Sequence, residues 1–174
     1  MDMIGWKAEW RIDKFKDQTG EIAKALQNGM SIEEAIEKFG NYLGYEKMED
    51  NVALNTGLQY LIEVICGIGT TTKWDNTNAR LGVGSDATAA DPTQTDLIDA
   101  TPTWKAMDAT YPQRATQVAE WRSTFASGDA NEAWNEYAVD NGVTAHKLMN
   151  RKVESKGTKV SGETWTLSLK ITYA

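Results

Sequence analysis

The sequence contains very few of the residue types on which most enzyme sites depend. Among its 174 residues there is one cysteine, Cys66, and one histidine, His146. A single cysteine excludes an internal disulfide. A Ser-His-Asp or Cys-His arrangement would have to use His146, and a zinc site would need both Cys66 and His146 together with carboxylates. The sequence therefore predicts no catalytic, cofactor or metal site, and a structural role for His146.

Long apolar runs and an excess of basic residues are also missing. The longest apolar run is interrupted by Glu63, so we expect no membrane-spanning segment. The N-terminus lacks the basic and apolar regions of a signal peptide. The 18 basic and 25 acidic side chains give a formal net charge of −7. Because phosphate binding needs clustered positive charge, we expect neither a nucleic acid nor a membrane as partner.

The overall composition is that of a globular protein, with 41% hydrophobic and 25% charged residues. The length suits one compact unit. We divide it into residues 1–50, with an N-terminal strand or arm and a short helical hairpin, and residues 51–174, with a further helix and an antiparallel β body. Residues 70–111 are rich in Thr, Asp, Ala and Gly, and within them we expect 85–96 to form a long ordered loop or an arm.

Alternation of apolar and polar residues with period two predicts several strands. The first covers residues 4–13, and its apolar side carries Trp6 and Trp10. The clearest covers residues 165–173, and we expect Trp165 to lie in the core. The other predicted strands are 79–83, 115–125 and 134–140. Strands at this spacing favour an α+β, mainly β fold with an antiparallel β-sandwich-like body.

Two short helices are predicted to form a hairpin between the first strand and residue 40. Residues 21–27 form the first helix, which Asn28 and Gly29 end. Ser31 and Glu34 have the spacing of a capping box, which opens a second helix that continues through Phe39. Neither helix is long enough to be stable alone, so we expect packing to hold both.

A third helix is predicted over residues 52–66, with Asn51 as its N-cap. Gly57 lowers the helix propensity but allows a neighbour to approach closely. The helix carries a stripe of apolar residues at three- and four-residue spacing, which predicts that it packs against the main core. The stripe consists of Leu54, Leu58, Leu61, Ile62 and Ile65.

Three motifs have both a chemical and a plain structural interpretation. Gly82 and Gly84 follow a predicted strand, but the lysine of a phosphate loop and the third glycine of a dinucleotide site are missing, so we expect turn glycines. The acid-rich region 75–99 does not have calcium-loop spacing, and local hydrogen bonds are expected there. Glu132 and Glu136 are spaced for acid–base work on one helix face, although salt bridges or a solvated face are favoured.

Two groups of residues are candidates for an interface. Tryptophan anchors cores and interfaces, and there are seven. The side of the N-terminal strand that carries Trp6 and Trp10 must pack on the rest of the fold or on another chain. As candidate interface residues, the two would be exposed anchors of a strand that adds to a neighbouring sheet. Residues 147–159 have a local charge of 5 − 1 = +4, which predicts contact with an acidic protein surface or, alternatively, a solvated hairpin. Their basic members are Lys147, Arg151, Lys152, Lys156 and Lys159.

Several short stretches between residues 51 and 173 are similar to a known class of proteins. They are residues 51–57, 81–84, 94–97, 130–139 (ANEAWNEYAV), 148–153, 157–159 and 164–167. In these stretches the chain resembles structural proteins of tailed-bacteriophage virions. Such proteins occur as capsid decoration or cement proteins, as head fibres, and as tail-fibre or collar components.

The resemblance implies a non-enzymatic virion protein, and we favour a capsid decoration (cement) protein that binds and stabilises the head shell. Its partners would be the major capsid protein or other virion proteins, and further copies of itself, as a trimer around a local three-fold axis. It would be soluble in the host cytoplasm before assembly and lie on the capsid surface afterwards. The alternatives are an adaptor or anchor of a head or tail fibre, and a carbohydrate-binding module that stacks tryptophans on sugars.

Overall fold

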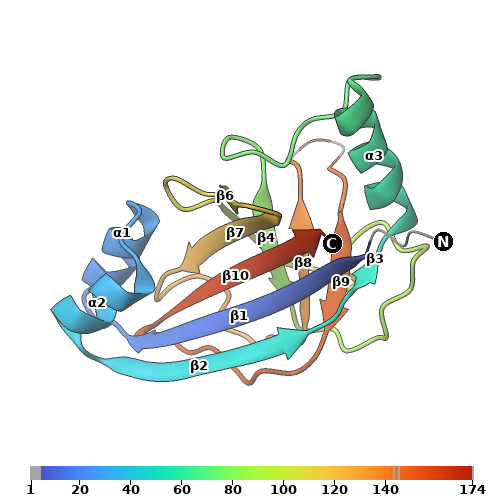
Figure 1. Ribbon diagram of the computed structural model, residues 1–174. Coiled ribbons are helices and arrows are strands. Elements are labelled where there is room, and N and C mark those ends of the chain that lie inside the picture. The colour runs from blue at the N-terminus through green and yellow to red at the C-terminus, as the bar shows by residue number, and fades with distance from the viewer. Residues whose placement is uncertain (1–4, 143, 145, 174) are drawn as a thin grey trace.

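The computed structural model describes residues 5–142, 144 and 146–173, which form two five-stranded antiparallel sheets and three short helices. The sheets pack face to face. Helices α1 and α2 lie at one end of this sandwich, and α3 projects from the other end (Figure 1). The predicted fold class is therefore confirmed. The two predicted helical regions, residues 21–39 and 52–66, thus lie at opposite ends of the sandwich.

The first sheet, sheet A, has the strand order β2-β1-β10-β7-β6. Its strands are β1 (Trp6–Lys16), β2 (Tyr42–Glu49), β6 (Gln113–Ala115), β7 (Val118–Phe125) and β10 (Glu163–Tyr173). β1 pairs with β10 along its whole length and with β2 on its other side. The predicted N-terminal strand is confirmed, although Ile4 lies outside the described residues. Because both edges of β1 are paired, the prediction that it is an arm for a neighbouring sheet is wrong.

The second sheet, sheet B, has the order β3-β9-β8-β4-β5. Its strands are β3 (Val52–Ala53), β4 (Arg80–Gly84), β5 (Thr103–Ala106), β8 (Glu136–Asp140) and β9 (Asn150–Val153). The predicted strands 79–83 and 134–140 correspond to β4 and β8. The predicted strand 115–125 is a hairpin instead, because the backbone turns between β6 and β7 at Thr116, whose φ is 51°.

The main core lies between the two sheets and is dominated by aromatic side chains. Trp134 packs edge-on against Phe125 and Trp165, with ring centroids 4.9 Å away in both cases. Fully burying a large apolar side chain contributes about 1.5–3 kcal/mol. Trp165 is buried, as predicted. The other buried tryptophans are Trp10, Trp74, Trp121 and Trp134.

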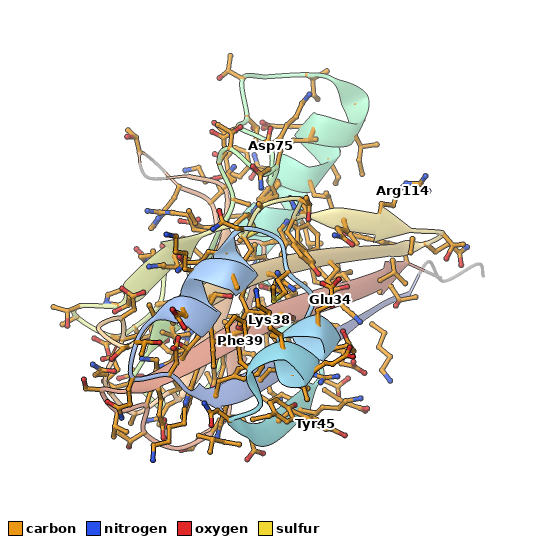
Figure 2. All side chains as sticks on the ribbon, turned by 90° about the vertical axis from the view of Figure 1, so that its left-hand side faces the viewer. Glu34, Lys38, Phe39, Tyr45, Asp75 and Arg114 are labelled. Carbon is orange, nitrogen blue, oxygen red and sulfur yellow. The ribbon has the colours of Figure 1, made fainter. Side chains whose placement is uncertain are left out.

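The helical hairpin forms as the sequence predicts. α1 (Glu21–Gln27) is followed by Asn28, and α2 (Ile32–Phe39) begins at the capping box of Ser31 with Glu34. The apolar sides of both helices pack with Phe15 in a second, smaller core at one end of sheet A. This end of the molecule faces the viewer in Figure 2, where α1 and α2 stand in front of the strands.

The third helix differs from its prediction in both its start and its packing. α3 (Asn55–Cys66) has Leu54 as its N-cap, not Asn51, because residues 52–53 pair as β3 with β9. Gly57 is its one buried residue and lies against the backbone of Leu148 and Met149. The close approach predicted for Gly57 is confirmed. The prediction that the apolar stripe packs wholly against the core is wrong.

We expect Gly57→Ala to destabilise the protein by about 1–2 kcal/mol, although alanine favours a helix by about 1 kcal/mol. A Cβ atom at this position would lie 2.5 Å from the carbonyl oxygens of Leu148 and Met149, which are backbone atoms. Urea unfolding measures the change. Gly128→Ala is the matched control, since a Cβ there meets nothing within 4 Å, and should change stability by less than about 0.5 kcal/mol. Equal stability of the two variants would contradict the close contact.

The outer face of sheet B is covered by the long segment between β4 and β5. Leu97 of this segment packs on Ala138 of β8. Trp104 of β5 lies over Gly82, where a Cβ would be 2.4 Å from the indole. Gly82 thus makes room for a ring. Because both Gly82 and Gly84 belong to β4, the prediction of turn glycines is wrong. All five residues of β8 are buried as a result.

Candidate interaction surfaces

The two tryptophans predicted as anchors lie in different environments. Trp10 is 0% exposed in the core between the sheets. It packs on Tyr137 with ring centroids 6.0 Å apart, so the prediction that Trp10 is an exposed anchor is wrong. Trp6 is half-buried at the start of β1 and meets Tyr173 edge-on at 6.3 Å. Of this pair, only Trp6 retains surface for a partner.

The basic residues 147–159 do not form one patch. Arg151 is 0% exposed and forms an ion pair with Glu136 at 2.7 Å. Lys152 and Lys156 share Glu154, at 3.0 and 2.5 Å. The remaining members are Lys147, which lies over the ring of Tyr60, and Lys159, which is buried. The prediction of a basic docking patch is corrected, because two of its five members are inside the protein and two share a carboxylate.

Lys159 is the most unusual of these residues because its ammonium is buried. Its Nζ donates to the backbone oxygen of Ala126 at 2.7 Å and to Oδ1 of Asn131 at 3.0 Å. Both acceptors are neutral, so little offsets the loss of water around the charge. Burial lowers the pKa of Lys159 to about 8. Through these two hydrogen bonds, Lys159 holds the segment between β9 and β10 against the segment between β7 and β8.

The carboxylate pair and the histidine have structural partners. Glu132 and Glu136 do not share a helix: Glu136 begins β8 and is 0% exposed, and Glu132 precedes it. Burial raises the pKa of Glu132, but Glu136 is occupied by Arg151. His146 lies between Asp140 and Asp96, at 3.0 Å from each. These contacts fit the structural role predicted for His146. Glu132 and Glu136 do not form a carboxylate pair in one cleft.

The acid-rich region 75–99 uses its carboxylates for local hydrogen bonds, as predicted. Asp86 accepts from the backbone N–H of Thr88, and Asp91 from that of Thr93, at 2.7 and 2.8 Å. Hydrogen bonds from the threonine side chains, together with these backbone bonds, lower the pKa of both aspartates. Among the residues that the structure describes, no group of three or more His, Cys, Asp or Glu side chains is placed to hold a metal ion.

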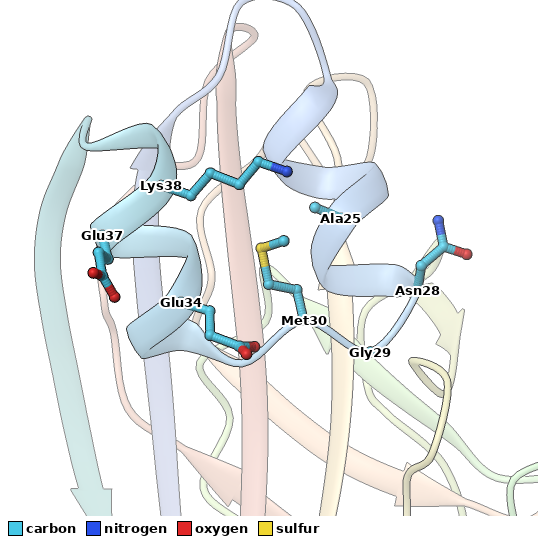
Figure 3. A pocket seen from close by; sticks show the side chains of 7 residues that line it. All are labelled: Ala25, Asn28, Gly29, Met30, Glu34, Glu37 and Lys38. Atoms are coloured by element: carbon cyan, nitrogen blue, oxygen red, sulfur yellow. The ribbon is translucent and has the colours of Figure 1, made fainter.

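Several hollows on the surface have polar or charged side chains in their linings, and two of them lie at the helical hairpin and on sheet A. The larger, of about 730 Å³, lies between α1 and α2 and is broadly open to solvent (Figure 3). One of its lining carboxylates, Glu34, accepts from the backbone N–H of Ser31 in the capping box, which lowers the pKa of Glu34. The smaller, of about 300 Å³, lies on the outer face of sheet A.

The smaller hollow has four acidic and four basic side chains, so it has no net charge to select an ion of either sign. Several of these charges pair across strands, as Lys47 does with Glu9 and Lys170 with Glu120. Exposed pairs at such distances contribute little to stability. The charged side chains that line it are Glu9, Arg11, Asp13, Glu33, Lys47, Glu120, Arg122 and Lys170.

The most distinctive surface is the outer side of α3. The exposed fractions of Leu58, Ile62 and Ile65 are 41%, 57% and 74%, and Ile68 just beyond the helix is 58% exposed. Half of the large exposed apolar side chains recorded for the described residues belong to this one segment. Large apolar patches on a surface mark sites of association. We call these four residues the α3 stripe.

Three residues of the α3 stripe, Leu58, Ile62 and Ile65, belong to the face that the sequence pattern predicts to be buried, and the structure leaves them exposed. A helix with a second, exposed apolar face differs from one with a single buried face in having apolar residues on both sides. Tyr60 and Val64 pack toward the main core, while Leu58 and Ile62 point away from it. A helix that only covers a core needs apolar residues on one side, so the second apolar side of α3 is not explained by packing within the monomer.

No model of a protein family matches the chain, and searches of curated proteins and of solved structures also return no match. No helix of the described residues is long and apolar enough to cross a membrane. The function proposed below therefore rests on the chain's own residues and surfaces.

Proposed function

We propose that the chain is a non-enzymatic structural protein of a tailed-phage virion, and specifically a capsid decoration protein that binds and stabilises the head shell. The phage setting comes from the resemblance of residues 51–173. The observation that carries a role in assembly is the α3 stripe, which leaves four large apolar side chains in water at one end of the sandwich. Association with another protein would remove this apolar surface from water.

The distribution of charge also supports an assembly role. Most buried charged side chains are paired with one another or with backbone groups, as Arg151 is with Glu136 and Arg122 with Asp108. Such pairs fix one arrangement of the loops and helices. A rigid body of this kind can be repeated many times on a lattice, where individually weak contacts add up through multivalency.

Copy number in the purified particle tests the proposal. Quantitative mass spectrometry against the major capsid protein should give a ratio near one copy per shell subunit, or per small group of subunits. A few copies per particle would instead support an adaptor of a head or tail fibre, and would overturn the decoration role. Absence from the particle would overturn the virion assignment, and a glycan-binding screen would then test the carbohydrate-binding alternative.

A further inference from the structure

α3 is apolar on two opposite sides, and the monomer covers only one of them. The inner side meets the body of the protein through Leu54, Gly57 and Val64. The outer side carries Leu58, Ile62 and Ile65, which are exposed. A helix of a globular protein normally buries its apolar residues and turns its polar ones, here Gln59 and Glu63 among them, toward water. The apolar outer side of α3 is therefore left in contact with water in the monomer.

The spacing of the exposed residues is that of a helix-pairing seam. Asn55, Leu58, Ile62 and Ile65 are separated by three, four and three residues, which is the a/d pattern of two helices packed side by side. The helix has twelve residues and is about 18 Å long. This seam is long enough for two turns of knobs-into-holes packing.

The charges on α3 favour a second copy of the same helix. The one charged residue of α3 is Glu63, which is half-buried and accepts a hydrogen bond from the hydroxyl of Thr71. The α3 stripe itself carries no charge, so two copies of a chain with net charge −7 can meet along it without placing like charges in contact. Its first turn has no acidic residue and its last turn no basic one. The partial charges of its helix dipole are therefore uncompensated. An antiparallel copy places each positive end beside a negative end.

We propose that the α3 stripe is a self-association surface, where α3 of a second copy packs antiparallel about a two-fold axis. In the register that this seam allows, Leu58 of one copy packs against Ile62 of the other, and Asn55 against Ile65. A two-fold interface uses the same patch on both copies. A lipid surface fits less well, because interfacial helices carry basic side chains and the described residues of α3 include none.

This inference rests on the proposed function, because it names the partner that binds the α3 stripe. The two proposals are tested by different experiments. Pairing is measured on the isolated protein, whereas decoration is measured on the particle. Pairing without incorporation into particles would overturn the proposed function alone. Incorporation of a strictly monomeric protein would overturn the pairing alone. If α3 is occupied by a second copy, the shell contact must use another surface.

Sedimentation over a range of concentrations gives the first test. We expect a mass twice that of the 19.3 kDa chain, with a dissociation constant roughly in the micromolar range for so small an interface. Ile62→Glu and Ile65→Glu should each weaken pairing by about tenfold or more. Val160→Glu is the matched control, because Val160 is 50% exposed outside α3, and it should pair normally. Near-ultraviolet circular dichroism checks that all variants remain folded.

The native Cys66 gives the orientation of the pair. Cys66 is exposed at the end of α3, so an antiparallel pair keeps the two thiols at opposite ends and an oxidant should not join them. Asn55→Cys should form a disulfide with Cys66 of the other copy, while Asn55→Cys combined with Cys66→Ser should not. Ready cross-linking of the unmodified protein through Cys66 would overturn the antiparallel arrangement and favour a trimer with parallel helices. A monomer at all concentrations would overturn the proposal itself.

Discussion

Replacing Arg151 by alanine should lower the free energy of unfolding by about 3–5 kcal/mol. Arg151 and Glu136 are both 0% exposed and are joined at 2.7 Å. Removing the guanidinium leaves a carboxylate that is buried without a cation, which is costlier than losing an exposed ion pair. Urea unfolding measures the change. Lys7→Ala is the control, since its pair with Glu49 is exposed, and it should cost less than about 1 kcal/mol.

The same substitution should release the long segment that covers sheet B. Arg151 donates through Nη1 to the carbonyl oxygen of Thr88 and to Oε1 of Gln94. Glu136 accepts from the backbone N–H groups of Ile98 and Asp99. In the Arg151→Ala variant, hydrogen exchange should therefore accelerate more in residues 85–99 than in β10. Uniform acceleration over the whole chain would show that the pair supports global stability without holding this segment.

Replacing Arg122 by alanine should cost a similar amount, about 3–5 kcal/mol. Arg122 forms a buried ion pair with Asp108 at 2.8 Å. Its Nη2 also donates to the carbonyl oxygens of Leu26 and Met30, at the end of α1 and just before α2. The loss thus strands a buried carboxylate and detaches the helical hairpin from β7. Thermal or urea unfolding measures the cost.

The cost of Arg122→Ala should depend on pH in a definite direction. Burial raises the pKa of Asp108 even with Arg122 beside it, so the folded protein takes up this proton before the unfolded chain does. Stability from this group therefore increases as pH falls toward the unfolded-state pKa of about 3.9. Without Arg122 the pKa rises further, and protonation removes the stranded charge. The difference from the unmodified protein should be larger at pH 7 than at pH 5.

Two outcomes would contradict this account of Arg122. One is a difference between the two proteins that does not change between pH 7 and pH 5. The other is an equal cost in a background where Asp108→Asn has already removed the carboxylate. In that background the cost should shrink, because the ion pair is already gone and the bonds to Leu26 and Met30 and the contact with the Tyr111 ring remain to be lost.

Local patterns predicted the elements whose cause is local. The capping box of Ser31 and Glu34 and the regular alternation of residues 165–173 each correspond to an observed element. Both depend on near neighbours in the chain. The hairpin at Thr116 was missed because alternation continued across the turn. The strand β2 was missed because it is an edge strand with mostly exposed side chains and no clear alternation of apolar residues.

The candidate interface could be predicted only in part, because exposure depends on what lies opposite. Trp6 and Trp10 have the same parity in one strand, yet Trp10 faces the other sheet and Trp6 lies at the rim. Arg151 and Lys152 are adjacent, and the first is buried while the second reaches the surface. Parity does not separate Trp6 from Trp10. It places Arg151 and Lys152 on opposite faces of β9, but it does not say which side chain a distant segment covers.

The sequence alone determined a mainly β chain with an N-terminal strand, a capped helical hairpin and a strong last strand, because period and capping are local properties. Tertiary structure decided which polar groups are buried and which apolar groups remain outside. Glu136 is buried because residues 85–99 fold over sheet B, and their cover depends on Arg151 from a distant strand. Ile62 stays exposed because one side of α3 meets the body and the other does not. Both outcomes follow from contacts between segments far apart in the chain, which a local pattern does not contain.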